Sequence, residues 1–370
     1  MHLIGYFPGS DFASDSQYGR QVHVYKFIQT ALTMDEVTCE FFVGDDGGQF
    51  PGDNVRSVMT TGSFPARLYH ELRRTLALVR TIRATDETTV LYTRESPHFA
   101  PIVAAELTAA KLVVESNGVP RNVRENVDSD LQYLTLTGVR RAKWRRADHV
   151  IAVSESVADY LRENHGVEAI TVVENGVDTD LFDCRTEVAS SPPYTICYVG
   201  GLQPWQNIEL MLQTISRMDI DAELLIVGGD EDRQTYLQSI AADEGISDRV
   251  TFVGRVPHED VPEYINRSDL CFGPFAEERP ASPLKMYEYL ACGREVALVN
   301  DDGLEFLDDY PGVHRFGFDD PDVLAAQIDD VLSAVATNDA GTEKVQRDRS
   351  WRAVTETVIS VCQTVSTDAN

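Results

Sequence analysis

Short runs of apolar, β-favouring residues alternate with stretches of helical periodicity along the whole chain, and this alternation narrows the possible folds more than any other feature. The first half is expected to contain six buried strands, at 2–7, 39–43, 89–93, 111–115, 149–154 and 171–175. Helices are expected at 20–33, 66–83, 98–110, 131–146 and 155–164. Strands that alternate with helices form parallel sheets. The first half is therefore predicted to be a Rossmann-like α/β domain.

The second half repeats this pattern. Its strands are expected at 194–200, 223–229, 249–254, 270–275 and 295–300. Between the halves, residues 183–193 are polar, rich in Ser and Pro and without periodicity, as expected of a linker. We predict an α/β fold of two Rossmann-like domains that face a cleft. The domains would be residues 1–182, with a C-terminal helix at about 351–370, and residues 194–350.

The charge of the chain is unusual. Its 370 residues include 60 acidic and 32 basic ones, which gives a formal net charge of −28 at pH 7, and only five of the basic residues are lysines. An acidic, lysine-poor surface suits a high-salt cytoplasm, because salt screens the self-repulsion of the protein. We therefore expect a halophilic, haloarchaeal source, with an acidic mesophilic protein as the alternative. Nucleic acid is not expected as a partner.

Basic residues gather in two parts of the first half. One cluster contains Arg67, Arg73, Arg74, Arg80 and Arg83, and the other contains Arg140, Arg141, Lys143, Arg145 and Arg146. Beside the first cluster, a predicted helical face contains Leu68, Leu72, Leu76 and Val79. Such a helix suits a membrane surface or an anionic acceptor. A core helix flanked by arginines is the alternative.

Several classes of protein are disfavoured. The six cysteines are scattered without the spacing of metal ligands, so neither a zinc site nor a disulfide framework is expected. No G-x-G-x-x-G follows the first strand and no G-x-x-x-x-G-K-[ST] is present, which argues against a dehydrogenase or a P-loop phosphotransferase. The sequence has neither a recognisable leader nor an uncharged stretch of membrane-spanning length. We therefore expect a soluble, cytoplasmic protein.

The segment 282–293, SPLKMYEYLACG, carries the clearest chemical signal. Ser282 is expected to cap a helix, with Pro283 in its first turn. The backbone amides at such a helix start bind phosphate together with the helix dipole, and Lys285 adds a positive charge. Glu288 lies about 7.5 Å farther along the axis than the first turn, which suits a carboxylate that binds ribose hydroxyls. The alternative is a capped surface helix with an ordinary glutamate.

This segment resembles the signature of glycosyltransferase family 4, whose members have the two-domain GT-B fold. Further blocks match the family in the same order along nearly the whole chain, at 147–155, 175–182, 198–212, 227–230, 252–256 and 350–351. The resemblance implies a retaining glycosyltransferase that uses a UDP- or GDP-linked sugar donor and neither a metal nor another cofactor. It also implies that the final helix crosses back onto the first domain.

The resemblance assigns donor-binding roles to Gly200, Gly201, Gln206, Gly229, Arg255, Val256, Ser282, Pro283, Leu284, Lys285 and Glu288. Lys285 and Glu288 are also catalytic candidates. Lys285 would stabilise the charge on the departing diphosphate, and Glu288 would bind the ribose. Arg255 and Val256 would flank the base. A metal-like D-x-D motif at 178–180 is expected to be structural, with no metal bound.

The chain departs from the family pattern at three positions. Pro280 stands where many members have the first Glu of an E-x7-E pair, and Gly201 and Gln206 stand where many have an Arg and a Lys. These departures leave open a non-catalytic partner subunit with a degenerate donor site, whereas Lys285 and Glu288 favour an active enzyme. A sugar-nucleotide epimerase of the same fold lacks support.

The acceptor is expected to meet the first domain, as a glycan or a polyprenyl-phosphate-linked glycan at the inner face of the cell membrane. Gly19 and His23 are predicted to contact it, because they follow a polar first loop; a mobile surface loop with a solvent-facing His is the alternative. Arg94 and Asn117 follow predicted strands, where α/β sheets place functional groups. Glu115 lies at the same edge, about where many relatives have a His, and is the third catalytic candidate.

Overall fold

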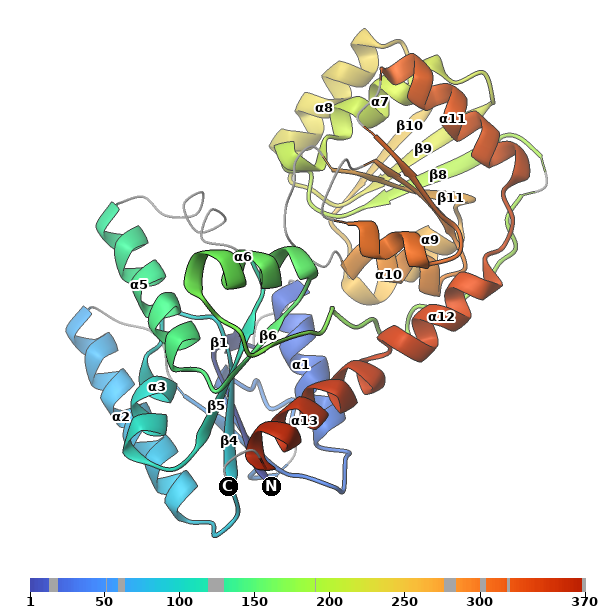
Figure 1. Cartoon of the computed structure of the whole chain (residues 1–370). Helices are drawn as coiled ribbons and strands as arrows, with labels where there is room; N and C mark the ends of the chain where they lie inside the picture. Colours follow the sequence, from blue (N-terminus) through green and yellow to red (C-terminus); the bar gives the residue numbers. More distant parts are fainter. Residues whose placement is uncertain are drawn as a thin grey trace. The chain divides into compact units, whose positions relative to one another are not determined.

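The computed structural model describes residues 1–12, 19–50, 52–58, 64–118, 130–189, 191–275, 284–299, 304–317 and 320–367. These residues form two compact units (Figure 1). Unit 1 comprises the described residues before Gly176 and after Ser350, and unit 2 comprises those from Gly176 to Ser350. The chain therefore passes from unit 1 to unit 2 at Gly176 and returns at Trp351.

Unit 1 is built on a seven-stranded sheet. Its strands are β1 (His2–Asp11), β2 (Thr38–Asp45), β3 (Val55–Ser57), β4 (Thr89–Arg94), β5 (Lys111–Ser116), β6 (His149–Ala152) and β7 (Ile170–Val172). They lie in the order β3-β2-β1-β4-β5-β6-β7, and the described pairings are parallel. The six predicted strands are confirmed. The short strand β3 was not predicted, because only one of its three residues is buried.

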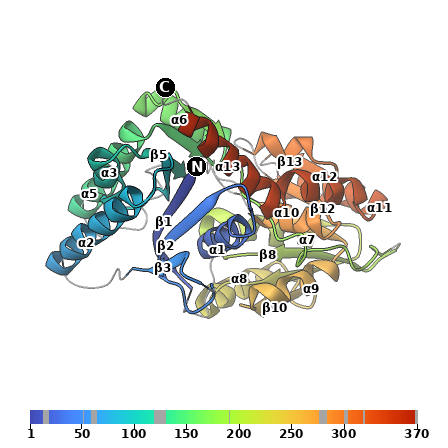
Figure 2. The same ribbon diagram turned by 90° about the horizontal axis from the view of Figure 1, so that it is seen from below.

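Helices cover both faces of this sheet. They are α1 (Gly19–Ala31), α2 (Phe64–Arg83), α3 (Ala100–Leu107), α5 (Asp130–Arg146), α6 (Glu155–His165) and α13 (Trp351–Thr367). Figures 1 and 2 show α2, α3 and α5 side by side on one side, and α1 with α13 on the other. Helix α13 packs against α1, β4 and β5. The prediction that the final helix crosses back onto the first domain is confirmed.

Unit 2 repeats this architecture with six strands. They are β8 (Tyr194–Val199), β9 (Ala222–Val227), β10 (Val250–Gly254), β11 (Leu270–Pro274), β12 (Glu295–Val299) and β13 (Val313–Phe316). Their order is β10-β9-β8-β11-β12-β13, and the described pairings are again parallel. Strand β13 was not predicted. Both units therefore have the Rossmann-like strand order, which reverses between β1 and β4 and between β8 and β11.

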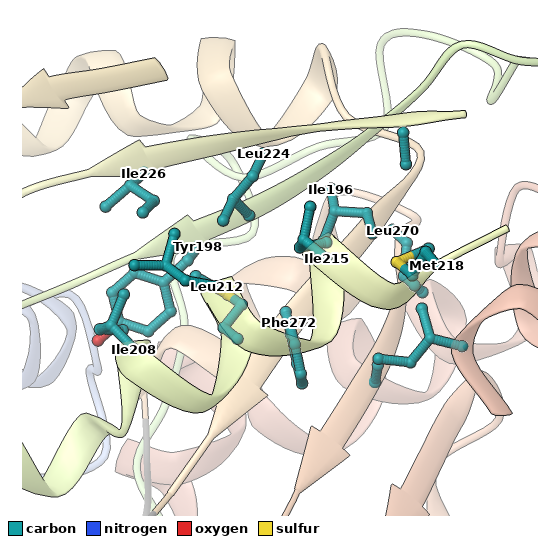
Figure 3. Close-up of a cluster of buried hydrophobic side chains, with 14 of the residues drawn as sticks. Ile196, Tyr198, Ile208, Leu212, Ile215, Met218, Leu224, Ile226, Leu270 and Phe272 are labelled. Carbon is teal, nitrogen blue, oxygen red and sulfur yellow. The ribbon is translucent and has the colours of Figure 1, made fainter. Parts of the chain in front are cut away.

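The helices of unit 2 pack on its sheet around a dense core. They are α7 (Ile208–Arg217), α8 (Glu231–Asp243), α9 (Val261–Asn266), α10 (Leu284–Ala291), α11 (Pro321–Ala334) and α12 (Asp339–Arg349). In Figure 3, side chains of α7 such as Ile208 and Leu212 interleave with Tyr198 of β8 and Phe272 of β11. This packing fixes β8 and β11 side by side. Among the described residues, no helix is both long enough and apolar enough to cross a bilayer.

The stretch predicted as a linker, 183–193, follows the crossing at Gly176, and its described residues, 183–189 and 191–193, belong to unit 2. The Asp269 carboxylate accepts hydrogen bonds from the amides of Ala189, at 2.6 Å, and Thr195, at 2.7 Å. The side chain of Asn266 accepts a bond from the amide of Arg185 at 3.0 Å. Polar composition here reflects hydrogen bonding to α9 and the residues that follow it.

Candidate functional site

The strand order of unit 2 reverses between β8 and β11, and ligands of α/β sheets bind beyond the carboxyl ends of strands at such a point. Gly200 follows β8 with φ 147°, and Gly228 follows β9 with φ 116°. A Cβ atom at Gly228 would lie 2.1 Å from the carbonyl oxygen of Gly200. A Cβ atom at Gly200 would lie 3.1 Å from Nζ of Lys285. Glycine at both positions therefore lets two strand ends and a lysine approach one another closely.

Lys285, in the first turn of α10, is held by uncharged groups. Its Nζ donates to Oε1 of Gln206 at 2.6 Å and to the hydroxyl of Tyr198 at 2.9 Å. It also lies 4.2 Å from the ring centroid of Tyr198 and 5.1 Å from that of Phe275. Burial lowers the pKa of Lys285 to about 7, although the charge of Glu288 acts in the opposite direction. An anion placed at this end of the sheet would stabilise the charged form of Lys285.

Glu288 lies one turn after Lys285 and is almost completely buried. Its Oε1 is 3.0 Å from Nε2 of His258, which belongs to the 3₁₀ turn His258–Asp260. The imidazole of His258 in turn contacts the ring of Phe182, with centroids 5.3 Å apart. The carboxylate of Glu288 is thus held in one orientation by a side chain from another loop.

Helix α10 is fixed against β8 by a buried hydroxyl. Tyr289 Oη accepts a hydrogen bond from the amide of Val199 at 2.8 Å and lies 3.3 Å from the carbonyl oxygen of the same residue. Residues three apart on a helix share a face, so Lys285 and Glu288 project to the same side of α10. The assignment of Lys285 to the diphosphate and of Glu288 to the ribose stays a prediction.

The other predicted donor residues that the structure describes lie in loops after the strands of unit 2 or at the start of α10. The carbonyl of Gly201 accepts a bond from Tyr198 at 2.7 Å. Gly229 has φ 79°. Arg255 is exposed and Val256 half-buried just after β10, whose Gly254 carbonyl accepts the amide of Gly228 at 2.7 Å. Leu284 begins α10, half-buried. Ser282 and Pro283, like Pro280, lie outside the described residues.

Sequence reasoning missed His258, Tyr198 and Tyr289. A signal for His258 was available, because it lies two residues after Val256, which was predicted to contact the base of the nucleotide. The hydroxyls of Tyr198 and Tyr289 gave no such signal. Tyrosines in apolar runs are typical of core packing, and only the fold brings their hydroxyls to Lys285 and Val199.

The D-x-D motif at 178–180 forms a turn. Oδ1 of Asp178 accepts hydrogen bonds from the amides of Asp180, at 3.3 Å, and Leu181, at 3.4 Å. The structural role predicted for this motif is consistent with these bonds. Across the parts of the chain that the structure describes, no three His, Cys, Asp or Glu side chains are grouped so that they could hold a metal ion.

A second polar cluster lies at the carboxyl ends of β4 and β5 in unit 1. Glu115 is 2% exposed, and its carboxylate accepts a hydrogen bond from the hydroxyl of Tyr92. Nε of Arg94 lies 3.0 Å from Oε1 of Glu115, and Nε2 of His23 lies 3.3 Å from Oε2. Arg94 also donates to Oδ1 of Asn117. The structure thus brings together four of the predicted acceptor-side and catalytic residues.

The surroundings keep Glu115 ionised. Burial by itself raises the pKa of a carboxyl group, but the charges of His23 and Arg94 and the hydrogen bond from Tyr92 hold the pKa of Glu115 well below its usual range. A carboxylate in this state is suited to orient Arg94 and His23. That Glu115 takes part in catalysis stays a prediction.

His23 is buried, so the alternative of a solvent-facing histidine is wrong. It lies in α1, which begins at Gly19 as the predicted loop boundary requires. Its Nδ1 is 2.9 Å from Oδ1 of Asn175, and its ring makes an edge contact with Trp351 at 5.0 Å. His23 therefore connects α1 to the residues at which the chain leaves and re-enters unit 1.

Two family models match the chain over most of its length. Residues 19–181 match "Glycosyltransferase Family 4", and residues 193–334 match "Glycosyl transferases group 1". The two matches correspond to the first and second Rossmann-like halves. The chain belongs to glycosyltransferase family 4.

Curated relatives match part of the chain. A D-inositol 3-phosphate glycosyltransferase of Mycobacteroides abscessus is 30% identical over 171 residues, which cover 43% of this chain and 38% of that protein. A glycogen synthase of Mycobacterium tuberculosis is 24% identical over 219 residues, which cover 57% and 52%. The chain thus spans about half or less of the length of these relatives.

Solved structures share the whole fold. Sucrose-phosphate synthase from Thermosynechococcus elongatus superposes with a TM-score of 0.75 at 18% identity over all of both chains. Anabaena Alr3699/HepE in complex with UDP has a TM-score of 0.71 at 15% identity, over 98% of this chain and 99% of that one. WaaG, a glycosyltransferase involved in lipopolysaccharide biosynthesis, has a TM-score of 0.59 at 12% identity, over 100% and 99%. The predicted GT-B fold is confirmed.

Proposed function

We propose that this chain is a retaining, metal-independent glycosyltransferase that moves a sugar from a UDP- or GDP-linked donor to a glycan or a lipid-linked acceptor. One observation carries the proposal. Lys285 and Glu288 lie one turn apart on α10, Nζ of Lys285 lies next to Gly200 at the reversal of strand order, and the described partners of Lys285 are uncharged. A diphosphate has the negative charge that Lys285 would bind, and ribose hydroxyls would donate hydrogen bonds to the carboxylate of Glu288.

Transfer breaks the bond between the anomeric carbon and the diphosphate oxygen. The nucleoside diphosphate leaves with the electron pair, the acceptor oxygen bonds to the anomeric carbon on the same face, and the proton of the acceptor hydroxyl passes to the departing diphosphate. Lys285, with the amides expected at the start of its helix, would neutralise the charge that develops on the leaving diphosphate. Glu288, held by His258, would fix the ribose and with it the position of the diphosphate.

The acceptor would meet the polar cluster of unit 1. We assign Arg94 and Asn117 to acceptor hydroxyls or to an acceptor phosphate, and Glu115 to the task of orienting Arg94 and His23. The named activities of relatives support an anionic or lipid-linked acceptor, since one is a D-inositol 3-phosphate glycosyltransferase and WaaG acts in lipopolysaccharide biosynthesis. Such an acceptor would bring the enzyme to the inner face of the cell membrane.

A non-catalytic subunit is the alternative, because Gly201 and Gln206 replace charged residues of the family. Gln206 nevertheless takes part in the arrangement, since its amide oxygen positions the ammonium of Lys285. The curated relatives are named as enzymes, which favours the transferase.

A thermal-shift panel tests the proposal. The protein, in molar KCl, is mixed with UDP, GDP and ADP and their common sugar conjugates, with Glu288→Ala as the control. A ligand at a hundredfold excess over its Kd stabilises the folded state by about 2.7 kcal/mol, so one nucleotide should raise the Tm clearly in the wild type and not in the variant. Cooperative melting with no shift from any nucleotide would favour the non-catalytic subunit.

A further inference from the structure

Large apolar side chains are exposed mainly on one side of unit 1. Of the eight that the described residues expose, six lie on three neighbouring helices: Leu68, Tyr69, Leu72 and Leu76 on α2, Leu107 on α3 and Leu134 on α5. Figures 1 and 2 show these helices side by side. The four on α2 are each between 46% and 57% exposed. Single exposed apolar residues are common, whereas a contiguous group indicates a binding surface.

The opposite side of α2 is fixed to the rest of unit 1, which determines the outward direction of these side chains. Oε2 of Glu71 accepts hydrogen bonds from the amides of Phe99, at 2.9 Å, and Ala100, at 3.1 Å, at the start of α3. About two and three turns farther along, Leu78 and Ile82 enter the core of unit 1. The predicted periodicity of α2 is therefore correct, and the alternative of a core helix is wrong for three of the four residues: Leu68, Leu72 and Leu76 face outward, whereas Val79 is buried.

Arginines accompany these apolar residues. The exposed residues Leu68, Tyr69, Leu72, Arg73, Leu76, Arg80 and Arg83, here called the α2 face, fall within an arc of about 140° at ~100° per residue. In the described part of α2 from Leu68 onward, the single acidic residue is Glu71, which is buried and paired with Arg74 at 2.6 Å. Exposed Arg141 and Arg145 lie on α5, while Arg67 lies outside the described side chains. The chain as a whole has a net charge of −28, so this concentration of positive charge is local.

We propose that the α2 face docks on an anionic lipid surface, with α2 parallel to the membrane plane. The leucines and Tyr69 would enter the boundary between head groups and acyl chains. The long stems of Arg73, Arg80 and Arg83 would let their guanidinium groups reach lipid phosphates. This inference rests on the proposed function in one respect, because that function gives the enzyme a reason to visit a membrane. The surface itself does not include the donor site.

Charge complementarity favours a lipid surface over a second copy of the chain. A bilayer offers negative charge directly above an apolar layer, which matches arginines that surround leucines on one helix face. A second copy that docked through the same face would place arginines against arginines, and its net charge of −28 repels the first copy as a whole. A dimer through the α2 face is therefore an outcome that the experiment must be able to detect.

Flotation with vesicles tests this surface. Purified protein is mixed with vesicles of phosphatidylcholine, alone or with phosphatidylglycerol, at low salt and in molar KCl. We expect retention by the anionic vesicles, weakened about fivefold for each arginine removed in Arg73→Gln and Arg80→Gln. Leu72→Ser with Leu76→Ser should abolish the retention that persists in molar KCl, because salt screens charge and leaves apolar burial intact. The matched control replaces exposed apolar residues of unit 2, Tyr236→Ser with Val323→Ser.

The outcomes separate the possibilities. Retention that falls in the α2 variants and not in the control supports the docking surface. No retention by anionic vesicles, an equal loss in the control, or a dimer that the α2 variants convert to monomer by light scattering would each overturn it. All variants should keep the nucleotide-induced thermal shift of the wild type. If the wild type binds anionic vesicles and no nucleotide shifts its Tm, the donor proposal fails and the docking surface stands.

Discussion

Replacing His258 by phenylalanine should weaken ribonucleotide binding through Glu288 alone. The phenylalanine ring can keep the contact with Phe182, whereas the bond from Nε2 to Oε1 of Glu288, 3.0 Å long, is lost. A hydrogen bond to a charged group contributes about 1.5–3 kcal/mol when it is buried. The side chain of His258 is 30% exposed and that of Glu288 12%, so about 1 kcal/mol is the appropriate magnitude. This corresponds to a loss of affinity of about fivefold.

Calorimetric titration with a nucleoside diphosphate and its 2′,3′-dideoxy analogue measures this effect. Wild-type protein should prefer the ribonucleotide. In His258→Phe the affinity for the ribonucleotide should fall about fivefold while that for the dideoxy analogue stays unchanged, because the analogue lacks the hydroxyls that Glu288 would bind. Glu288→Gln is the control and should lose much of the preference. An equal loss for both ligands would show that His258 merely supports the local fold, and the reasoning would be refuted.

Three further changes test other parts of the structure. The pKa of Lys285 without ligand is about 7, and a bound diphosphate would raise this pKa. Diphosphate affinity should therefore fall by up to about tenfold per pH unit above pH 7, and calorimetry in buffers of different ionisation enthalpy should show proton uptake on binding. An affinity that does not change with pH would contradict this prediction. Gly228→Ala, which brings a Cβ atom within 2.1 Å of the Gly200 carbonyl oxygen, should destabilise unit 2 by about 2 kcal/mol or more and abolish nucleotide binding, whereas a wild-type Tm would show that the loop relaxes freely. Glu115→Ala removes the buried carboxylate that pairs with Arg94, whose side chain is 13% exposed, and should lower the free energy of unfolding by about 3 kcal/mol in a denaturant titration, while nucleotide binding in unit 2 persists. Normal stability would contradict the orienting role of this carboxylate.

Most of the fold follows from periodicity in the sequence. Most of the strands that were predicted consist mainly of buried apolar residues, and this composition marks a central parallel strand. The predicted edge strands β7 and β10 are only partly buried. Strands β3 and β13 lie at sheet edges and are short and partly exposed, so they carry no such pattern. Helix α2 shows a limit of periodicity. Leucines four residues apart mark a helix face, but the buried Glu71 decides that the opposite face packs against the core.

The candidate site was predictable where its residues follow strands or share a helix. Arg94, Glu115 and Asn117 follow or end neighbouring strands, and adjacent parallel strands bring such ends together. Lys285 and Glu288 lie one turn apart on one helix. In contrast, His258 meets Glu288 across thirty residues, and Tyr92 meets Glu115 from within a strand core. Such contacts depend on sheet order and register, which local pattern does not determine.

The central claim is that Lys285 binds the diphosphate of a nucleotide donor, and comparison of a nucleoside diphosphate with its monophosphate tests it most directly. Both ligands are titrated into the wild type and into Lys285→Met, which keeps an unbranched stem near Tyr198 and removes the charge. We predict that the wild type binds the diphosphate at least tenfold more tightly than the monophosphate, and that the variant loses most of this difference while its affinity for the monophosphate changes little. An undiminished preference for the diphosphate in Lys285→Met, or no binding of either ligand to the wild type, would contradict the account.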